Sequence, residues 1–234
     1  MRSWHAMDAA GFASTITAAG FALATDAWAT DADGEALMRR YLDDDELAAL
    51  IARPPRARQQ TLLGRIAAKD AVRVHLAKHR GLEVEPDAVA ITNDEAGRPV
   101  LVGDWVGDVR LSIAHTATIG VALVGDGIDV GIDIEPIEPR SPRFEMLTLT
   151  DAEQRLDPVP GDDRDAWLTR LWAAKEACAK STGQGLGGRP KDFRVERTDG
   201  TRLLVNGRWI MTDRYRAADL SGYVVAWTLI PTSL

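Results

Sequence analysis

The sequence is poor in cysteine and has no long apolar run. Cys178 is the single cysteine among 234 residues. An internal disulfide therefore cannot form, and this cysteine usage fits a reducing compartment such as the cytoplasm. No stretch reaches about 18 consecutive apolar residues, so the sequence predicts no membrane-spanning helix. The phosphate-binding loop G-x-x-x-x-G-K-[ST] is also absent, which argues against the ordinary P-loop nucleotide-binding fold.

Positive charge is scarce as well. Lys and Arg number 28 against 35 Asp and Glu, so the formal net charge is −7. A chain of this kind lacks the positive field of a general nucleic-acid-binding protein, and we expect no nucleic-acid partner. Apolar residues make up 45% of the sequence, which is ordinary for a globular protein. The length suits one large domain or two of about 115 residues each.

The N-terminal stretch Gly11–Ala24 loosely resembles a secretory leader. Ser14 and Thr17 interrupt its apolar run, and Asp26 lies beside the small residues that would form a cleavage site. A leader needs an uninterrupted apolar segment and an uncharged site, so we interpret residues Phe12–Trp28 as the first strands of a domain. We expect the protein to be cytoplasmic.

Each half of the chain contains one strongly predicted helix. Apolar residues recur at helical spacing from Gln59 to His79, and Gly81 is placed to end that helix. A second helix is expected from Asp165 to Ser181, followed by a run of glycines. Arg65 and Lys69 belong to a basic stripe on the first helix, which is more typical of a solvated face than of an anion site.

Strands surround both helices. Alternating apolar residues and turn signals predict strands at 89–92, 100–102, 109–115, 119–124, 128–134, 193–196, 202–205, 208–211 and 223–229. Gly125–Gly127 predicts a hairpin turn between the strands on either side of it. The order of elements, a long helix and then several strands, recurs in residues 1–125 and 126–234. We therefore expect an α+β fold of two similar halves.

Four charged residues in the second half could form a site. Asp133 and Glu135 lie two apart in the predicted strand Val130–Pro136, so both side chains point to one side of it. Glu176 and Lys180 lie four apart in a helix and share one face. Taken alone, the second pair is most simply a surface ion pair. Together the four residues suit a hard cation and a phosphate.

These residue types suit phosphoryl transfer. Carboxylate oxygens are the ligands that Mg²⁺ prefers, and a lysine can neutralise the charge of a phosphate. His115, at the end of a predicted strand, could donate a hydrogen bond to a phosphate oxygen or be structural. Phosphoryl transfer needs mainly positioning and charge neutralisation. A metal-dependent nuclease or phosphohydrolase is an alternative use of the same groups.

The motifs also resemble a known family. The strand sequence VGIDIEP and the later helix sequence LWAAKEACAKSTGQGL resemble the paired signatures of the 4′-phosphopantetheinyl transferases. Three further matches occur in the same order as in that family: Arg58–Arg65, Gly97–Pro99 and Leu111–Thr116. The resemblance runs from roughly residue 58 to residue 193. The length resembles that of the larger, pseudo-dimeric members, and the segment LLGRIAAKDAVR resembles members associated with polyketide synthases.

The resemblance implies a fold and a reaction. In such members two similar α+β halves are related by pseudo-two-fold symmetry, with the active site at their interface, and the protein is a monomer. A holo-[acyl-carrier-protein] synthase of this type moves the 4′-phosphopantetheine arm of coenzyme A onto a serine of an acyl or peptidyl carrier protein. It releases 3′,5′-ADP and depends on Mg²⁺, with Mn²⁺ as an alternative. The carrier would belong to a fatty-acid, polyketide or peptide synthase.

The resemblance also implies roles in catalysis and metal binding. Asp133, Glu135 and Glu176 would hold the metal on the pyrophosphate of coenzyme A. Glu176, directly or through a water, would take the proton of the carrier serine, and Lys180 would stabilise the departing phosphate. His115 would contact a phosphate. Spacing alone leaves the acid and base assignment between Glu176 and Lys180 open.

A second implied group binds coenzyme A. Thr61 and Arg98 would help hold the nucleotide end, and His115 and Lys180 would contact phosphates. Arg58 would meet the 3′-phosphate, with the nearby Arg53 and Arg56 as alternatives.

The sequence departs from the family pattern at two places. Acidic residues occupy positions 43–46, where relatives carry basic ones, and Ala114 replaces a serine before the histidine. Neither change removes an implied metal ligand. A non-catalytic protein that binds carriers or coenzyme A on the same scaffold remains an alternative. The segment Pro136–Arg155 is the candidate docking face for a carrier, although an ordinary surface loop is equally compatible with it.

Overall fold

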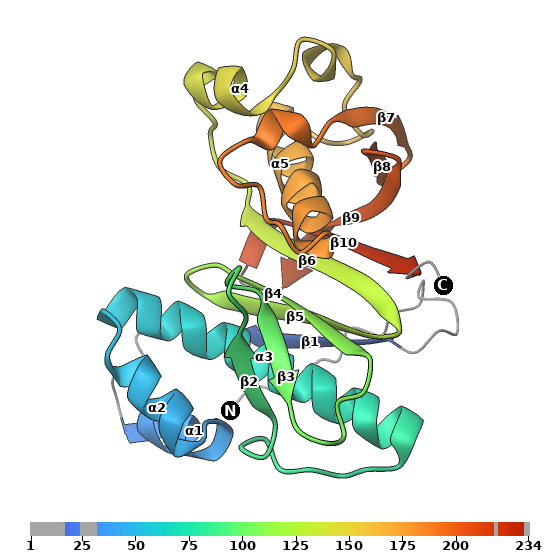
Figure 1. Cartoon of the computed structure of the whole chain (residues 1–234). Coiled ribbons are helices and arrows are strands. Elements are labelled where there is room, and N and C mark those ends of the chain that lie inside the picture. Colours follow the sequence, from blue (N-terminus) through green and yellow to red (C-terminus); the bar gives the residue numbers. More distant parts are fainter. Residues whose placement is uncertain (1–16, 24–31, 218–219, 232–234) are drawn as a thin grey trace. The chain divides into compact units, whose positions relative to one another are not determined.

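The structure is a computed structural model that describes residues 17–23, 32–217 and 220–231. Its contacts divide the chain into unit 1, Met1–Ile128 with Thr232–Leu234, and unit 2, Asp129–Pro231. Within each unit a long helix packs on an antiparallel sheet (Figure 1). The predicted α+β class is therefore confirmed. None of the described helices is both long and apolar enough to cross a membrane.

Unit 1 is organised around α3. Its elements are α1 (Ala32–Tyr41), α2 (Asp44–Ile51), α3 (Pro55–Arg80), β1 (Thr17–Leu23), β2 (Ala90–Asn93), β3 (Pro99–Val102), β4 (Val109–His115) and β5 (Ile119–Asp126). The sheet order is β1-β5-β4, and β2 and β3 form a separate pair. Pro55 begins α3, and Gly81 ends it with a left-handed φ of 63°. Of the expected strands in residues 12–28, only β1 lies within the described residues.

The apolar stripe of α3 packs as predicted. Leu62, Leu63 and Ile66 are buried in one core with Ala122 and Val124 of β5. That core fixes α3 across one face of the three-stranded sheet.

The basic stripe on α3 is not a solvated face. Lys69 is fully buried, and its ammonium group pairs with the carboxylate of Glu46 in α2. Arg73 contacts Asp70 and donates to the carbonyl of Val84. The prediction was wrong because α2 covers this part of α3. A lysine there must bury its charge against a partner, and Glu46 provides it.

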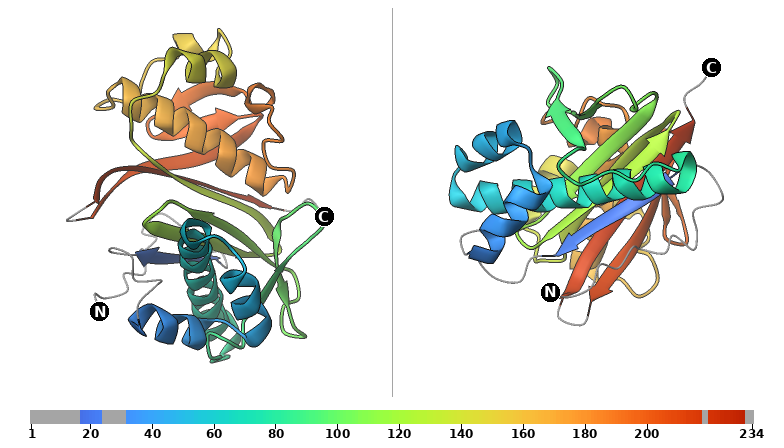
Figure 2. Two further views of the ribbon diagram at one scale, coloured as in Figure 1. Left: turned by 90° about the vertical axis from the view of Figure 1, so that its left-hand side faces the viewer. Right: turned by 90° about the horizontal axis from the view of Figure 1, so that it is seen from below.

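Unit 2 is organised around α5. Its elements are β6 (Ile128–Pro136), α4 (Pro142–Thr148), the 3₁₀ turn η2 (Glu153–Arg155), α5 (Arg164–Ser181), the 3₁₀ turn η3 (Pro190–Asp192), β7 (Val195–Asp199), β8 (Arg202–Val205), β9 (Arg208–Ala217) and β10 (Leu220–Pro231). The sheet order is β6-β10-β9-β8-β7, and α5 lies along one face of it (Figure 2). Cys178, the single cysteine, is buried in this core.

The predicted hairpin at Gly125–Gly127 does not form. β5 pairs with β1 and β4, whereas β6 belongs to the five-stranded sheet beside β10. Gly127 joins the two strands with a left-handed φ of 66°, and its N–H donates to the carbonyl oxygen of Asp108. A glycine between two apolar strands signals a sharp turn, but it does not specify which strand each side will pair with.

Both units use a glycine where the long helix crosses the sheet. A Cβ atom at Gly131 of β6 would lie 2.0 Å from the carbonyl oxygen of Ala177 in α5. A Cβ atom at Gly120 of β5 would lie 2.3 Å from the carbonyl oxygen of Leu63 in α3. Only glycine permits such a close approach of two backbones. The shared device agrees with an internal duplication, while the pseudo-two-fold axis stays a prediction.

Replacing Gly131 by alanine is expected to destabilise unit 2. The added methyl group must push α5 away from β6, and overpacking of this kind costs roughly 1–3 kcal/mol of the free energy of unfolding. Urea unfolding of the full chain measures the change. Gly200→Ala is the control, since a Cβ there meets open space and adds only the strain of a positive φ. Equal losses in the two variants would contradict a close helix–strand contact at Gly131.

Candidate functional site

The helix α5 and the strand β6 bring four of the predicted site residues together. The missing Cβ of Gly131 points at α5, so Asp133 and Glu135, two and four positions later, lie on that same side of β6. Lys180 Nζ lies 2.8 Å from Asp133 Oδ1. Glu176 lies one turn before Lys180 and is close enough to both strand carboxylates for their charges to raise its pKa. The close helix–strand crossing therefore assembles this group, which we call the β6–α5 site.

The β6–α5 site concentrates negative charge in a partly buried place. Burial, and then the charges of Asp133 and Glu135, raise the pKa of Glu176 to about 7, while Lys180 opposes the shift. Burial and Asp133 also raise the pKa of Glu135, against the hydrogen bond from Trp172. Near neutral pH, Glu176 is thus poised between its charged and neutral forms.

The donor set of the β6–α5 site fits a hard divalent cation. Asp133 is 5% exposed, and its buried Oδ2 has no hydrogen-bond partner among the described residues. An unsatisfied buried carboxylate oxygen is costly, and so are neighbouring carboxylates that repel one another. A cation such as Mg²⁺ would relieve both costs through the oxygen ligands that it prefers. Even so, no three carboxylate, histidine or cysteine side chains in the described residues already converge as a ligand set.

Glu135 is already held by contacts that would compete with binding of a metal ion. Trp172 Nε1 donates to its Oε1 at 3.0 Å, and Arg140 Nη2 lies 3.4 Å from its Oε2. The Arg140 guanidinium also lies over the ring of Phe144, whose edge contacts Trp172. To join a three-carboxylate ligand set, Glu135 would have to exchange these contacts. The spacing of Trp172, four residues before Glu176, was the sequence signal for its place at this site.

The predicted residues of unit 1 gather near the start of α3. Arg58 Nη2 donates to the carbonyl oxygen of Ile51 at 2.7 Å, so its guanidinium caps the C-terminal end of α2. Thr61 lies one turn further along α3. His115 ends β4 and is exposed, and a Cβ atom at Gly64 would lie 3.3 Å from its ring carbon Cδ2. Thr61 and His115 therefore border the same half of α3.

Arg98 and Arg65 of unit 1 differ in their exposure and in their partners. Arg98 is exposed in the turn between β2 and β3, where its Nε lies 3.2 Å from Asp94 Oδ2. Arg65 is mostly buried, and its Nε lies 4.0 Å from Glu46 Oε1. Its Nη1 has no hydrogen-bond partner within the described part of the chain. Arg65 is thus a better candidate than Lys69 for holding a further anion.

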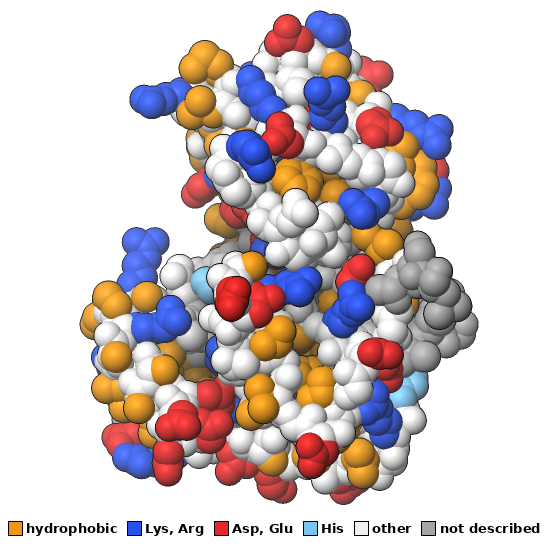
Figure 3. Space-filling model, viewed as in Figure 1, with side chains coloured by type: hydrophobic (Ala, Val, Ile, Leu, Met, Phe, Trp, Pro, Cys, Tyr) orange, Lys and Arg blue, Asp and Glu red, His pale blue; other side chains and the backbone are white. Residues whose placement is uncertain are grey.

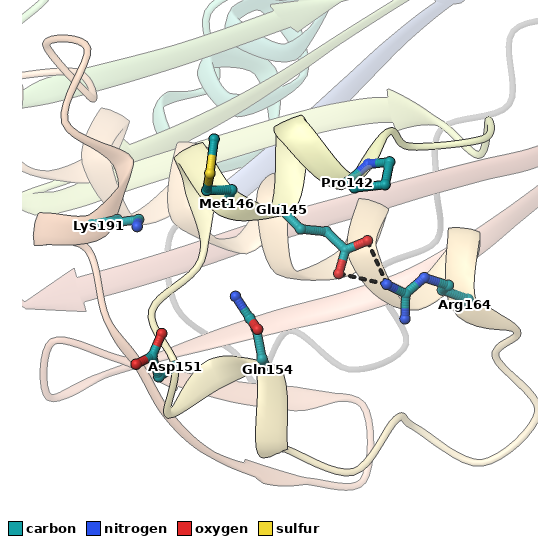
Figure 4. A pocket seen from close by; sticks show the side chains of 7 residues that line it. All are labelled: Pro142, Glu145, Met146, Asp151, Gln154, Arg164 and Lys191. Atoms are coloured by element: carbon teal, nitrogen blue, oxygen red, sulfur yellow. Dashed lines mark hydrogen bonds and ion pairs between the residues drawn. The ribbon is translucent and has the colours of Figure 1, made fainter.

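A separate hollow lies beside α4. It has a volume of about 300 Å³ and is lined by Pro142, Glu145, Met146, Asp151, Gln154, Arg164 and Lys191 (Figure 4). Arg164 Nη2 pairs with both oxygens of Glu145 at 2.5 and 2.6 Å. None of the predicted metal-binding or catalytic residues lines this hollow, so it is distinct from the β6–α5 site.

Removing the charge of Glu176 is expected to stabilise the metal-free protein. A raised carboxyl pKa means that stability falls as pH rises from the ordinary value towards about 7. Glu176→Gln should therefore gain about 1–3 kcal/mol at pH 8 and little at pH 5. Urea unfolding at both pH values measures this gain, with the exposed Glu138→Gln as control. A less stable Glu176→Gln at pH 8 would contradict mutual repulsion at this site.

Added Mg²⁺ should raise the melting temperature of the wild type more than that of Glu176→Gln.

Comparison with known proteins places the chain in a family. The family model described as "4'-phosphopantetheinyl transferase superfamily" matches residues 129–228, which lie within unit 2. A holo-[acyl-carrier-protein] synthase from Chlorobaculum tepidum is 32% identical over 96 residues, which cover 40% of this chain and 80% of that protein. A holo-(acyl-carrier-protein) synthase from Bacillus anthracis, solved in complex with CoA, is 24% identical, covers 45% of this chain and 92% of that one, and gives a TM-score of 0.36.

Longer relatives match over a smaller share of their own length. The 4′-phosphopantetheinyl transferase HetI of a Nostoc species is 28% identical over 110 residues, 45% of this chain and 46% of that protein. The 4′-phosphopantetheinyl transferase psf-1 of Bacillus pumilus is 27% identical over 129 residues, 55% of this chain and 52% of that protein. The chain thus spans about half the length of these two relatives. On the family match and the Chlorobaculum relative together, the chain belongs to the 4′-phosphopantetheinyl transferase superfamily.

Proposed function

We propose that the chain transfers the 4′-phosphopantetheine arm of coenzyme A to a serine of an acyl or peptidyl carrier protein. The observation that carries this proposal is the β6–α5 site, where Glu176 lies close to Asp133, Glu135 and Lys180 and a buried oxygen of Asp133 has no partner in the described residues, in a chain of this superfamily. The relatives, which are 4′-phosphopantetheinyl transferases and holo-[acyl-carrier-protein] synthases, support the same reaction.

Asp133, Glu135 and Glu176 are the residues that would hold Mg²⁺, or Mn²⁺ in its place. The ion would neutralise charge on the pyrophosphate of coenzyme A. The buried, unpartnered Oδ2 of Asp133 is the strongest structural support for this assignment. Glu135 would join the set after leaving its contacts with Trp172 and Arg140.

Proton transfer in the proposed reaction is assigned to Glu176. Its carboxylate would accept the proton of the serine hydroxyl, directly or through a water. The serine oxygen bonds to the phosphorus nearest the pantetheine arm, and the bond from that phosphorus to the bridging oxygen breaks. The electron pair leaves with 3′,5′-ADP. Lys180, held beside Asp133, neutralises the phosphate that departs.

The nucleotide end of coenzyme A is assigned to unit 1. Thr61 and His115 border one half of α3, and Arg98 is exposed in a neighbouring turn. Lys180 of unit 2 would contact the phosphates. Arg58 is kept as a candidate for the 3′-phosphate, although part of its guanidinium is already used on α2.

The carrier is assigned to the exposed surface of α4. Met146 is 60% exposed and Leu147 is 55% exposed, and Arg143 beside them is exposed as well. Arg140 of the same segment is only 12% exposed and pairs with Glu135 and Glu138, so Arg143 is the better candidate to contact an acidic carrier. In the view of Figure 3, hydrophobic side chains are exposed over α4. An acidic carrier with an apolar helix face would match Arg143, Met146 and Leu147.

The transfer itself is tested by intact-mass spectrometry. An apo acyl carrier protein incubated with this protein, coenzyme A and Mg²⁺ should gain the mass of one phosphopantetheine arm. The gain should disappear with EDTA and fall by at least about a hundredfold in rate for Glu176→Gln, as for other positioned acid–base groups. Glu83→Gln, at an exposed position of unit 1 outside the β6–α5 site, should keep the wild-type rate. Full activity of Glu176→Gln would remove the proposed mechanism, and no gain with any class of carrier would count against the proposed function.

Charge reversal at Arg143 tests the docking surface. Arg143→Glu should raise the KM for an acidic carrier several-fold, since like charges then face each other, and leave the KM for coenzyme A unchanged. The matched control is Arg194→Glu, an exposed arginine of unit 2 that lies outside α4. Steady-state kinetics over a range of carrier concentrations measures both constants. An unchanged carrier KM in Arg143→Glu means that the carrier binds elsewhere.

A further inference from the structure

Two fully buried residues of unit 2 form an ion pair that the proposed reaction does not use. Lys175 Nζ lies 2.7 Å from Glu153 Oε1, and neither side chain is exposed. Lys175 precedes Glu176 in α5, so its side chain leaves the helix about 100° away from that of Glu176. Burying two charges costs desolvation energy, and such a pair is weak evidence for stability by itself. The segments that the pair connects indicate a role in positioning.

The pair joins several segments to α5 at one point. Lys175 Nζ also donates to the carbonyl oxygens of Thr148 at 2.8 Å and Pro190 at 3.2 Å. Glu153 Oε1 accepts from the N–H of Val195 at 2.7 Å. Glu153 Oε2 accepts from the N–H and the hydroxyl of Thr150 at 2.6 and 2.9 Å. The end of α4, the turns η2 and η3 and the start of β7 are thereby held to α5.

These are the segments that form the hollow beside α4. Its lining residues come from α4, from the turn at η2, from η3 and from the first turn of α5 (Figure 4). At the other end of α4, the Phe144 ring contacts Trp172 of α5 with centroids 5.5 Å apart. A helix of 7 residues is too short to be stable by itself, so its position depends on these two ties and on the ion pair between Glu145 and Arg164.

We propose that Lys175 and Glu153 are positioning residues that fix α4 and the hollow on α5, and that engagement of the carrier protein depends on this tie. The second half of the proposal rests on the proposed function, which assigns the carrier to α4. Neither residue is assigned a contact with coenzyme A or the metal. Loss of the pair should therefore weaken carrier recognition and leave the chemical step intact.

The test uses a double variant so that the fold survives. Lys175→Met alone would leave Glu153 as an uncompensated buried charge, which costs several kcal/mol. Lys175→Met with Glu153→Gln removes both charges while keeping the side-chain volumes close, so it leaves no uncompensated buried charge. It nevertheless removes the lysine donor to Thr148 and Pro190.

The same helix offers a matched control. Arg170 and Asp162 form a second buried pair, with Nε 2.6 Å from Oδ2, and Arg170 also donates to Thr212 of β9. Neither Asp162 nor Thr212 lines the hollow, and in the described residues no hydrogen bond or ion pair joins either one to α4. Arg170→Met with Asp162→Asn therefore removes a buried pair from α5 without touching the proposed tie.

Hydrogen exchange followed by mass spectrometry on the full chain gives a readout that is independent of activity. In the Lys175/Glu153 variant, amides of residues 143–149 and 191–195 should exchange about tenfold faster or more, because local opening becomes easier there. The Arg170/Asp162 variant should leave those amides unchanged. Kinetics should show a several-fold higher carrier KM in the first variant alone, with the coenzyme A KM and the kcat at saturating carrier unchanged.

The outcomes distinguish the positioning role of the pair from its effect on carrier recognition. Unchanged exchange in α4, or an equal rise in both variants, would overturn the positioning role. Faster exchange in α4 with an unchanged carrier KM would overturn the link to carrier recognition. If the wild type transfers no phosphopantetheine arm, the proposed function fails, and the exchange comparison still decides the positioning role.

Discussion

The close contact between Gly131 and the carbonyl of Ala177 is the constraint on which the β6–α5 site depends. With no Cβ at Gly131, α5 can lie directly on β6. Asp133 and Glu135 then face Glu176 and Lys180 across a distance short enough for ion pairing and for mutual repulsion. A helix held further away would leave ordinary exposed carboxylates with ordinary pKa values.

The charged residues on and beside α5 are of two kinds: some are buried with their partners, and others lie in the β6–α5 site with unsatisfied or repelling neighbours. Lys175 and Arg170 are buried, and each has an acidic partner and carbonyl or hydroxyl acceptors. Asp133, by contrast, keeps a buried oxygen without a partner in the described residues, and burial raises the pKa of Glu176 to about 7. Native structures satisfy nearly all buried polar groups, so the exceptions point to places where a ligand is expected.

The two units contribute differently to the family assignment. The family model matches residues 129–228, nearly all of unit 2, and the carboxylate motifs lie there. Unit 1 repeats the arrangement of a long helix crossing a strand at a glycine, with Gly120 against Leu63. It lacks the carboxylates, and it carries the residues that we assign to the nucleotide. A shared packing device with different chemistry is what a duplicated half would retain, because packing constrains small residues more strongly than exposed ones.

The sequence by itself determined the elements and the type of site. Local periodicity identified α3, α5 and most strands, and the spacings in VGIDIEP and in Glu176–Lys180 put like side chains on one face. Tertiary structure decided which elements meet. It placed β6 in a sheet apart from β5, buried Lys69 against Glu46, and joined Lys175 to Glu153. Periodicity encodes which face of an element is apolar, whereas partners, burial and pKa values depend on residues far apart in the chain, and only packing brings those together.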